Sequence, residues 1–447
     1  MQYIIKDNKN ARDVALYALI NITDAGRKGN VFLRETLDKQ QELEPRDRAL
    51  CEHVVSGTLD HLYAIDEVIG KYSKTPVSKL NPYIRGILRL SVCQLLYMDR
   101  IPASAAINEG TELAKKHGLT GLSGFVNGVL RNVSRDNEKG VSEDTKLRRV
   151  MEEGHIRYSV PKWLYVKLAD DFGIDAAEKL FESWLLLRKT SVRFNLSKDL
   201  SEDEIVSLIR SDGIEAEKIC DVPPVYELSG LSGNGVATLK AFSEGYITVQ
   251  DASAAEAVAL CPPEEGNYVI DLCAAPGGKS LAFADAMCGT GTVDSRDVSE
   301  QKIRLISENA KRCGFENIRV SVKDALKKDK DMALMADIVI ADLPCSGLGV
   351  VAKKPDIKKN ITPETITDLR NLQRDILENA VTYVKPGGRL LYSTCTVTKE
   401  ENEENAMYIA EKFSLKPLIM KRIMPDEHHD GFFISVFLKP DDSRREN

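Results

Sequence analysis

The chain has 447 residues, of which 43% are hydrophobic and 29% charged, and its formal net charge is −7. This length allows about three domains of ~150 residues, and the composition is that of an ordinary globular protein. No apolar run approaches the ~18 residues that a membrane span needs, and the N-terminus lacks the pattern of a secretory signal. We therefore expect a cytoplasmic protein without a membrane partner.

The cysteines and the distribution of charge further narrow the class of protein and its possible partners. The nine cysteines are odd in number and form no C-x-x-C pair, which argues against a disulfide framework and a zinc cluster. We expect no bound metal. Residues 1–150 carry 23 Lys and Arg against 19 Asp and Glu, although the whole chain is acidic. A mildly basic front third is compatible with a nucleic-acid partner.

The first third of the chain, residues 1–140, is predicted to be helical. Apolar residues recur at helical spacing in four stretches, residues 11–23, 46–72, 81–98 and 123–136. The polar run 135–146 is predicted to be a linker. Residues 150–245 then mix a helical stretch (201–213) with strand candidates (190–198 and 225–230), which indicates a small α+β module.

From residue 246 to about residue 440 the pattern alternates between strands and helices. Five apolar strands are predicted at 267–273, 291–297, 318–322, 336–343 and 389–394. Apolar strands separated by helices indicate a parallel sheet covered on both faces. Two closing strands at 415–420 and 431–439 leave no room for a crossover helix, so these two are predicted to be antiparallel.

The stretch "CAAPGGKS" (273–280) lies between the first of these strands and a helix, so its backbone N–H groups face a ligand site. A phosphate-binding P-loop is incomplete here, because Cys273 stands where that motif needs glycine, and no G-x-G-x-x-G occurs. An adenosyl ligand fits better, with a strand-end carboxylate for its ribose. Asp294 and Asp297 compete for that role, and Asp324 follows the third strand.

Two cysteines stand at the ends of the fourth and fifth strands. Cys345 follows Asp342 and Pro344 in "ADLPCSGLG", and Cys395 lies in "YSTCT". Ligands of open α/β sheets bind at the carboxyl ends of the strands, so we expect both thiols to face one crevice. A lone strand-end cysteine is more often an inert buried thiol, but a matched pair favours function.

Thiols beside an adenosyl group indicate methyl transfer to a pyrimidine. A thiolate is a strong soft nucleophile; by adding to carbon 6 of the ring it makes carbon 5 reactive toward a sulfonium methyl group. A second thiol or a carboxylate helps to release the product. Asp342 is placed to bond the Watson–Crick edge of a cytosine and to offset the charge that builds up.

The motifs "DLCAAPGGKS", "DLPCSGLG" and "YSTCTVTKEEN", with "EGYITVQDASA" before them and "HDGFFISVFLK" after them, resemble the RNA (cytosine-5) methyltransferases of the Nol1/Nop2/Sun family. The helical front resembles a NusB-type RNA-binding domain. The resemblance implies three domains: a NusB-like helical domain (1–140), a small α+β module (150–245), and a Rossmann-like class I methyltransferase domain with a seven-stranded, mostly parallel sheet (246–440).

The same resemblance implies the roles of individual residues. Cys395 is expected to be the nucleophile and Cys345 to help release the product, although DNA cytosine-5 enzymes use the Pro-Cys thiol as nucleophile. S-adenosyl-L-methionine is the expected cofactor. Its expected contacts, in one list, are Cys273, Ala274, Ala275, Pro276, Gly277, Gly278, Lys279, Asp297, Asp324 and Asp342.

The expected substrate is a cytosine of 16S ribosomal RNA, unpaired or flipped out, in free RNA or an early assembly intermediate, and the protein is expected to act as a monomer. Two alternatives stay open: the same chemistry on transfer RNA, and a non-catalytic NusB-like RNA-binding or antitermination factor. Retention of Cys345, Cys395, Asp342 and the glycine turn argues against the second.

Three further expectations concern details. Thr398 and Glu401 have capping-box spacing, which would place Cys395 near a helix N-terminus and partly lower its pKa against the neighbouring glutamates. The basic stretch 353–359 is expected to be exposed, either solvated or touching RNA phosphates. Cysteines 51, 93, 220, 261, 288 and 313, and both tryptophans, are assigned to packing.

Overall fold

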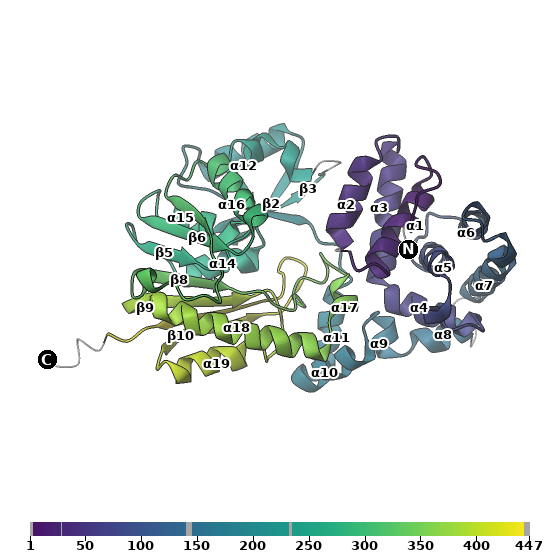
Figure 1. The fold of residues 1–447 in the computed structure, drawn as a ribbon. Helices are drawn as coiled ribbons and strands as arrows, with labels where there is room; N and C mark the ends of the chain where they lie inside the picture. Colours follow the sequence, from purple (N-terminus) through teal and green to yellow (C-terminus); the bar gives the residue numbers. More distant parts are fainter. Residues whose placement is uncertain (1–2, 28, 140–144, 232–234, 442–447) are drawn as a thin grey trace. The chain divides into compact units, whose positions relative to one another are not determined.

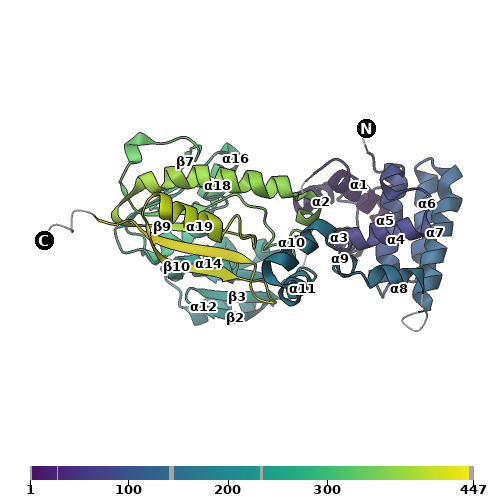
Figure 2. The ribbon, with the colours of Figure 1, turned by 90° about the horizontal axis from the view of Figure 1, so that it is seen from below.

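In the computed structural model, residues 3–27, 29–139, 145–231 and 235–441 are described (Figures 1 and 2). They form two compact units, the first made of Met1–Leu185 and Val351–Asn360, and the second of Leu186–Val350 and Ile361–Asn447. Residues 135–138 of the expected linker are helical, so the prediction is wrong there, and residues 140–144 lie outside the described residues. No described helix is long and apolar enough to cross a bilayer. The expected division into three domains stays a prediction.

The first unit is helical, as predicted for residues 1–140; its helices between residues 146 and 183 fall largely in the range expected for the small α+β module. Its elements are α1 (Ala11–Thr23), α2 (Gly29–Lys39), α3 (Pro45–Asp60), α4 (Leu62–Tyr72), the short η1 (Val77–Lys79), α5 (Pro82–Tyr97), α6 (Ala103–Lys116), α7 (Thr120–Glu138), α8 (Lys146–Met151), α9 (Gly154–Arg157), α10 (Lys162–Phe172) and α11 (Ile174–Ser183). Gly86 lets α5 approach α1, because a Cβ there would lie 2.8 Å from Leu16 Cδ1. The stretch 46–72 holds two helices, broken at His61.

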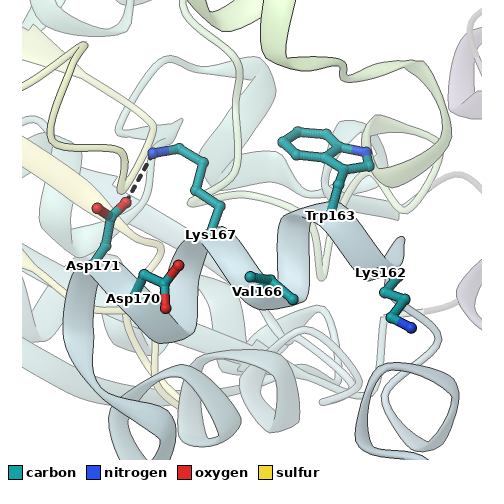
Figure 3. Close-up of a pocket in the computed structure, with 6 residues that line it drawn as sticks. All are labelled: Lys162, Trp163, Val166, Lys167, Asp170 and Asp171. Atoms are coloured by element: carbon teal, nitrogen blue, oxygen red, sulfur yellow. Dashed lines mark hydrogen bonds and ion pairs between the residues drawn. The ribbon is translucent and has the colours of Figure 1, made fainter.

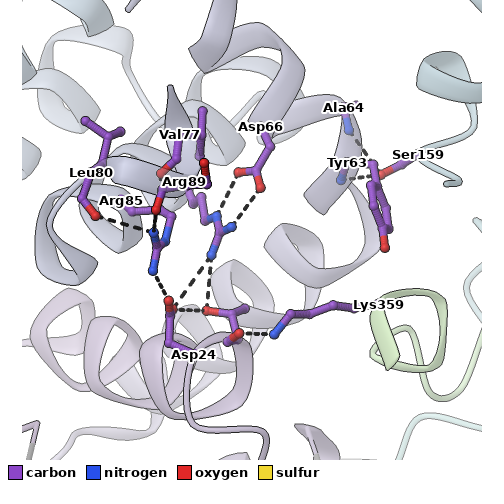
Figure 4. A network of polar contacts seen from close by, with 12 residues as sticks. Asp24, Tyr63, Ala64, Asp66, Val77, Leu80, Arg85, Arg89, Ser159 and Lys359 are labelled. Atoms are coloured by element: carbon purple, nitrogen blue, oxygen red, sulfur yellow. Dashed lines mark hydrogen bonds and ion pairs between the residues drawn. The ribbon is translucent and has the colours of Figure 1, made fainter. Parts of the chain in front are cut away.

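The segment 351–360, which carries α17 (Ile357–Asn360), is built into this helical unit. The Lys358 ammonium is buried and donates to the Asp60 carbonyl at 2.6 Å. Lys359 donates to the Thr23 carbonyl, beside a network in which Arg89 binds Asp66 in two places (Figure 4). The expectation of an exposed basic loop is therefore wrong for Lys358 and Lys359, because both ammonium groups serve main-chain carbonyls.

The two tryptophans differ in their surroundings. Trp184 is 1% exposed, and its ring centroid lies 5.2 Å from that of Phe181, so its assignment to packing is confirmed. Trp163 is half-buried on α10, where it lines a hollow of about 720 Å³ together with Lys162, Val166, Lys167, Asp170 and Asp171 (Figure 3).

The second unit contains a small sheet and a large one. The small sheet is antiparallel in the order β2-β3-β1-β4, with β1 (Thr190–Phe194), β2 (Glu215–Asp221), β3 (Pro224–Ser229) and β4 (Ile247–Val249). The helices α12 (Glu202–Ser211) and α13 (Lys240–Ser243) and the turn η3 (Gly235–Thr238) belong to the same part of the chain. Ser201 and Glu204 form a reciprocal capping box at α12.

The large sheet has seven strands in the order β10-β11-β9-β8-β5-β6-β7. Its strands are β5 (Tyr268–Asp271), β6 (Thr292–Asp297), β7 (Ile318–Val322), β8 (Ala336–Asp342), β9 (Val384–Thr394), β10 (Lys416–Ile423) and β11 (Phe432–Leu438). Strands β5 to β9 are parallel, and β11 is antiparallel to β9 and β10. The predicted Rossmann-like, mostly parallel sheet is confirmed.

Helices cover both faces of this sheet (Figures 1 and 2). Residues of α14 (Ala252–Leu260), α15 (Gly278–Ala286) and α16 (Glu300–Cys313) share one apolar cluster with Val269 and Ile340. Residues of α18 (Pro363–Tyr383) and α19 (Glu403–Lys412) share the other with Ile270 and Val339. The turn η4 (Lys330–Met332) precedes β8. The strand order reverses between β5 and β8, and ligands of such open sheets bind at the carboxyl ends of the strands at this point.

Candidate active site

The glycine turn joins β5 to α15 at this reversal of the strand order. Gly277 is the N-cap of α15 and has φ +108°, a backbone conformation that side chains disfavour. The turn is fastened to its neighbours by two hydrogen bonds: Ala274 N–H donates to the Arg296 carbonyl at 2.9 Å, and the Asn309 side-chain amide donates to the Pro276 carbonyl at 3.0 Å. The turn is therefore held rigidly against β6 and α16.

The two acids that compete for the ribose have different surroundings. Asp294 accepts hydrogen bonds from Arg296 at 2.5 and 2.9 Å and from the Tyr268 hydroxyl at 3.2 Å. Asp297, at the end of β6, is 3% exposed, and its Oδ1 accepts no hydrogen bond, although Lys302 Nζ lies 3.3 Å away. Both carboxylates thus have a cationic neighbour, but only Asp297 also has a buried oxygen that accepts no hydrogen bond.

Asp271 is a site residue that the sequence reading missed. It ends β5, is 1% exposed, and accepts from Ser280 Oγ at 2.7 Å, while its Oδ1 accepts no hydrogen bond. Burial raises the pKa of Asp271 to about 7. Its position at the strand end just before the glycine turn is the signal that could have found it. Beside it, burial and the nearby Asp271 carboxylate raise the pKa of the Cys273 thiol to about 12.

Asp342 links the glycine turn to the ends of β8 and β9. Its Oδ2 lies 2.7 Å from Lys279 Nζ, and its Oδ1 accepts from Ser393 Oγ at 2.7 Å. Lys279 in turn sits 4.7 Å from the ring centroid of Phe432, a cation–π contact. Three of the expected site elements, namely the turn, β8 and β9, are therefore joined by one ion pair and its hydrogen bonds.

The two cysteines meet as the sequence predicts. Asp342 and Ser393 are register partners of adjacent strands, and the chain continues from each into a loop. We call residues 343–350 the Cys345 loop and residues 395–402 the Cys395 loop. The Sγ atoms of Cys345 and Cys395 are 3.3 Å apart, and both residues are partly exposed. The hydrogen bond to Cys395 and burial hold the pKa of Cys345 well above its ordinary value.

Backbone contacts hold the Cys345 loop between its neighbours. Gly349 N–H donates to the Cys395 carbonyl at 3.0 Å, and Gly431 N–H donates to the Gly349 carbonyl at 2.8 Å. A Cβ on Gly349 would lie 1.9 Å from the Gly431 carbonyl oxygen, so only glycine fits there. The loop is clamped from both sides.

The expected capping box after Cys395 is wrong. α19 begins at Glu403, and its N-cap Asn402 makes no side-chain capping bond. Thr398 Oγ1 instead donates to the carboxylate of Glu401 at 2.7 Å. The capping spacing is satisfied by a side-chain pair inside the loop, so no helix N-terminus lies directly after Cys395 to lower the pKa of its thiol.

One further expected site residue, Asp324, lies at the edge of the large sheet. Asp324 follows β7, and its Oδ1 accepts from Leu326 N–H at 3.0 Å. Cys288 is exposed, so its assignment to packing is wrong, whereas Cys51, Cys93, Cys261 and Cys313 are buried. Among the described residues, no group of three or more His, Cys, Asp and Glu side chains is placed to hold a metal ion.

Comparisons with known proteins agree on both parts of the chain. Residues 257–438 match the model of the family described as 16S rRNA methyltransferase RsmB/F, and residues 9–135 match the NusB family. A probable ribosomal RNA small subunit methyltransferase B from Bacillus subtilis is 34% identical over 96% of this chain and 99% of its own. A protein of the same description from Synechocystis is 31% identical over the same shares.

A solved structure supports the fold of the whole chain. The crystal structure of PH0851 has a TM-score of 0.79 and 26% identity, and it covers 98% of this chain and 100% of its own. The helical front, the small sheet and the seven-stranded sheet thus recur together in one known structure.

Proposed function

This chain belongs to the RsmB/F family of 16S ribosomal RNA methyltransferases, and on that premise we propose that it methylates carbon 5 of a cytosine through a covalent cysteine adduct. The observation that carries the proposal is the pair of thiols 3.3 Å apart. Cys345 follows Asp342 in the chain, and an ion pair with Lys279 joins Asp342 to the glycine turn.

The residues around the glycine turn fit S-adenosylmethionine, which supplies an electrophilic methyl group on a sulfonium. The Oδ1 of buried Asp297, which accepts no hydrogen bond, is an acceptor for ribose hydroxyls. The turn from Cys273 to Lys279, with Gly277 at the N-terminus of α15, offers N–H groups to an anionic group. Asp324 and Asp342 complete the proposed contact set. Asp297 is preferred to Asp294, whose carboxylate is already paired with Arg296.

The proposed division of labour rests on the family resemblance, and the charge around the two thiols is compatible with it. Two hydrogen-bonded thiols share at most one negative charge, because a second anion would be repelled by the first. Burial and the nearby carboxylate of Glu401 also disfavour a thiolate on Cys345. With the roles that the family resemblance implies, the proton stays on Cys345 and the anion forms on Cys395, the proposed nucleophile.

The proposed reaction breaks as many bonds as it forms. The Cys395 sulfur would bond to carbon 6 of the cytosine. The electron pair that this places at carbon 5 would take the methyl group as its bond to the donor sulfur breaks, which leaves the donor as a neutral thioether. A base then removes the carbon 5 proton, and the bond from sulfur to carbon 6 breaks. The carboxylate of Asp342 is proposed to accept a hydrogen bond from the base edge, which offsets the charge that builds up on attack.

The proposed substrate is 16S ribosomal RNA, with the target base out of its stack so that the thiol can reach carbon 6. The NusB match of residues 9–135 supports an RNA-binding role for the helical unit. Action on transfer RNA is the second candidate. A monomer in the cytoplasm and free RNA or an early assembly intermediate as substrate remain expectations.

The test is methyl transfer from labelled S-adenosylmethionine to deproteinised ribosomal RNA, followed by nucleoside analysis and bisulfite mapping. We expect 5-methylcytidine at one position of 16S RNA and none with Cys395→Ala. A different methylated nucleoside, or full activity of Cys395→Ala, would overturn the proposed chemistry. Labelling of transfer RNA alone would favour the second candidate.

A further inference from the structure

Glu401 lies fully buried between the Cys345 loop and the Cys395 loop. It takes no step in the proposed reaction, and the sequence predicts a capping box for it. Its Oε1 accepts from Ser346 N–H at 2.8 Å, and its Oε2 accepts from Ser346 Oγ at 2.5 Å and from Thr398 Oγ1 at 2.7 Å. One carboxylate therefore binds the residue after Cys345 and a residue three positions after Cys395.

A second layer fixes Glu401 itself. Gln373 of α18 donates to Glu401 Oε1 at 3.1 Å and to the Pro344 carbonyl at 2.9 Å. The Tyr392 hydroxyl donates to the Glu401 carbonyl. Ser346 Oγ also lies 2.6 Å from Thr396 Oγ1, a direct bridge between the two loops. Burial raises the pKa of Glu401, and the bonds from Ser346 and Thr398 oppose that rise.

In this arrangement neutral donors satisfy a buried carboxylate. A buried carboxylate is expensive unless donors satisfy it, and here the donors come from the two loops that carry the reactive thiols. Hydrogen bonds to an ionised acceptor are short and directional, so they fix the separation of the loops more closely than apolar packing would.

We propose that Glu401 is a positioning residue that holds the Cys345 loop against the Cys395 loop and so keeps the two thiols within hydrogen-bond distance. The proposal rests on the proposed function for the roles of the thiols, but the distance it explains does not. Loss of the carboxylate would leave Ser346 and Thr398 without their shared acceptor, and the two loops would separate.

The first experiment measures the thiol distance without RNA. The oxidant diamide takes two hydrogens from a pair of thiols, whose S–H bonds break as one S–S bond forms and the azo group becomes a hydrazine. Purified full-length protein is treated with diamide, and the linked Cys345–Cys395 peptides are quantified by mass spectrometry. The variants are Glu401→Gln and Ser346→Ala, with Glu404→Gln as control, because Glu404 is exposed on the same chain segment.

We expect linkage in Glu401→Gln to be about 10–100-fold slower than in the wild type, since a misplacement near 1 Å costs that much in such a reaction. Ser346→Ala keeps the main-chain donor, so its linkage rate should lie between those of Glu401→Gln and the wild type. The linkage rate of Glu404→Gln should equal that of the wild type. Equal linkage rates in Glu401→Gln and the wild type would overturn the proposal. If Glu401→Gln does not fold, the rate of Ser346→Ala decides in its place.

The second experiment asks whether the displaced loop impairs product release. With RNA and S-adenosylmethionine, Glu401→Gln should accumulate covalent protein–RNA complex toward the level of Cys345→Ala, an effect that general loss of stability would not produce. If Cys345→Ala accumulates complex and folded Glu401→Gln loses activity without doing so, Glu401 has no such role. If Cys345→Ala itself accumulates none, the proposed function is at fault, and the diamide rates still decide the role of Glu401.

Discussion

Lys279 Nζ and Asp342 Oδ2 lie 2.7 Å apart and join the glycine turn to the end of β8. The Lys279 side chain is 8% exposed and that of Asp342 34% exposed. Because the Cys345 loop directly follows Asp342, this ion pair connects the proposed cofactor turn to the proposed reactive thiols. Removing either charge should therefore affect both binding and chemistry.

Lys279→Met is expected to weaken S-adenosylmethionine binding and to lower stability. The change leaves Asp342 charged with Ser393 as its remaining side-chain partner, and since Asp342 is partly exposed we expect a loss of only about 1–2 kcal/mol. Calorimetric titration and thermal unfolding measure the two effects. Lys311→Met is the control for stability, because Lys311 is exposed on α16; an equal loss of stability in both variants would contradict the role of the ion pair.

Asp297→Asn and Asp294→Asn should separate binding from stability. Asp297→Asn is expected to raise the Kd for S-adenosylmethionine at least about tenfold, the effect of one lost charge-assisted hydrogen bond. Asp294→Asn breaks the pair with Arg296, so it should lower the melting temperature and leave the Kd nearly unchanged. The opposite pattern would assign the ribose to Asp294.

Gly349→Ala should damage the site by separating its loops. The new Cβ would fall 1.9 Å from the Gly431 carbonyl oxygen, a backbone atom that cannot move alone. We expect a destabilisation of about 1–3 kcal/mol and loss of methyl transfer, measured on the same preparation. Gly124→Ala, on the open side of α7, meets no atom within 4 Å and should retain full activity. Normal turnover of Gly349→Ala would show that the clamp around the loop is dispensable.

The buried Lys358 should make the stability of the protein depend on pH in the alkaline range. Burial lowers the pKa of Lys358 to about 8, below the ~10.4 of an unfolded chain. Between these values the unfolded state binds more protons, so stability should rise with pH across this window. Urea unfolding from pH 7 to 10.5 measures the free energy of unfolding of the wild type and of Lys358→Met. The difference between the two curves isolates the contribution of Lys358. A difference curve that is flat or falls with pH would contradict the assignment.

Much of the fold could be predicted because its signals are local. Apolar strands with strand-end acids, such as Asp297 and Asp342, fix the sheet class, and parallel adjacency of β8 and β9 brings Cys345 to Cys395. β2 escaped notice because it is largely exposed and carries mostly polar side chains, so it lacks an apolar face.

What could not be predicted depends on tertiary partners. Thr398 and Glu401 have the spacing of a capping box, but Ser346, 55 residues upstream, captures the carboxylate instead. Lys358 looks like a surface charge until Asp60, nearly 300 residues earlier, supplies a carbonyl for its ammonium. Such long-range contacts leave no periodic trace in the sequence.

The account stands or falls on the covalent bond between Cys395 and the RNA base. The most direct measurement is the intact mass of Cys345→Ala after incubation with 16S ribosomal RNA and S-adenosylmethionine, followed by nuclease digestion. The account predicts a species heavier by one methylated cytidine nucleotide, with the added mass mapped to Cys395 and absent from the Cys345→Ala/Cys395→Ala double variant. Methylated RNA released with no adduct, or an adduct that persists without Cys395, would contradict it.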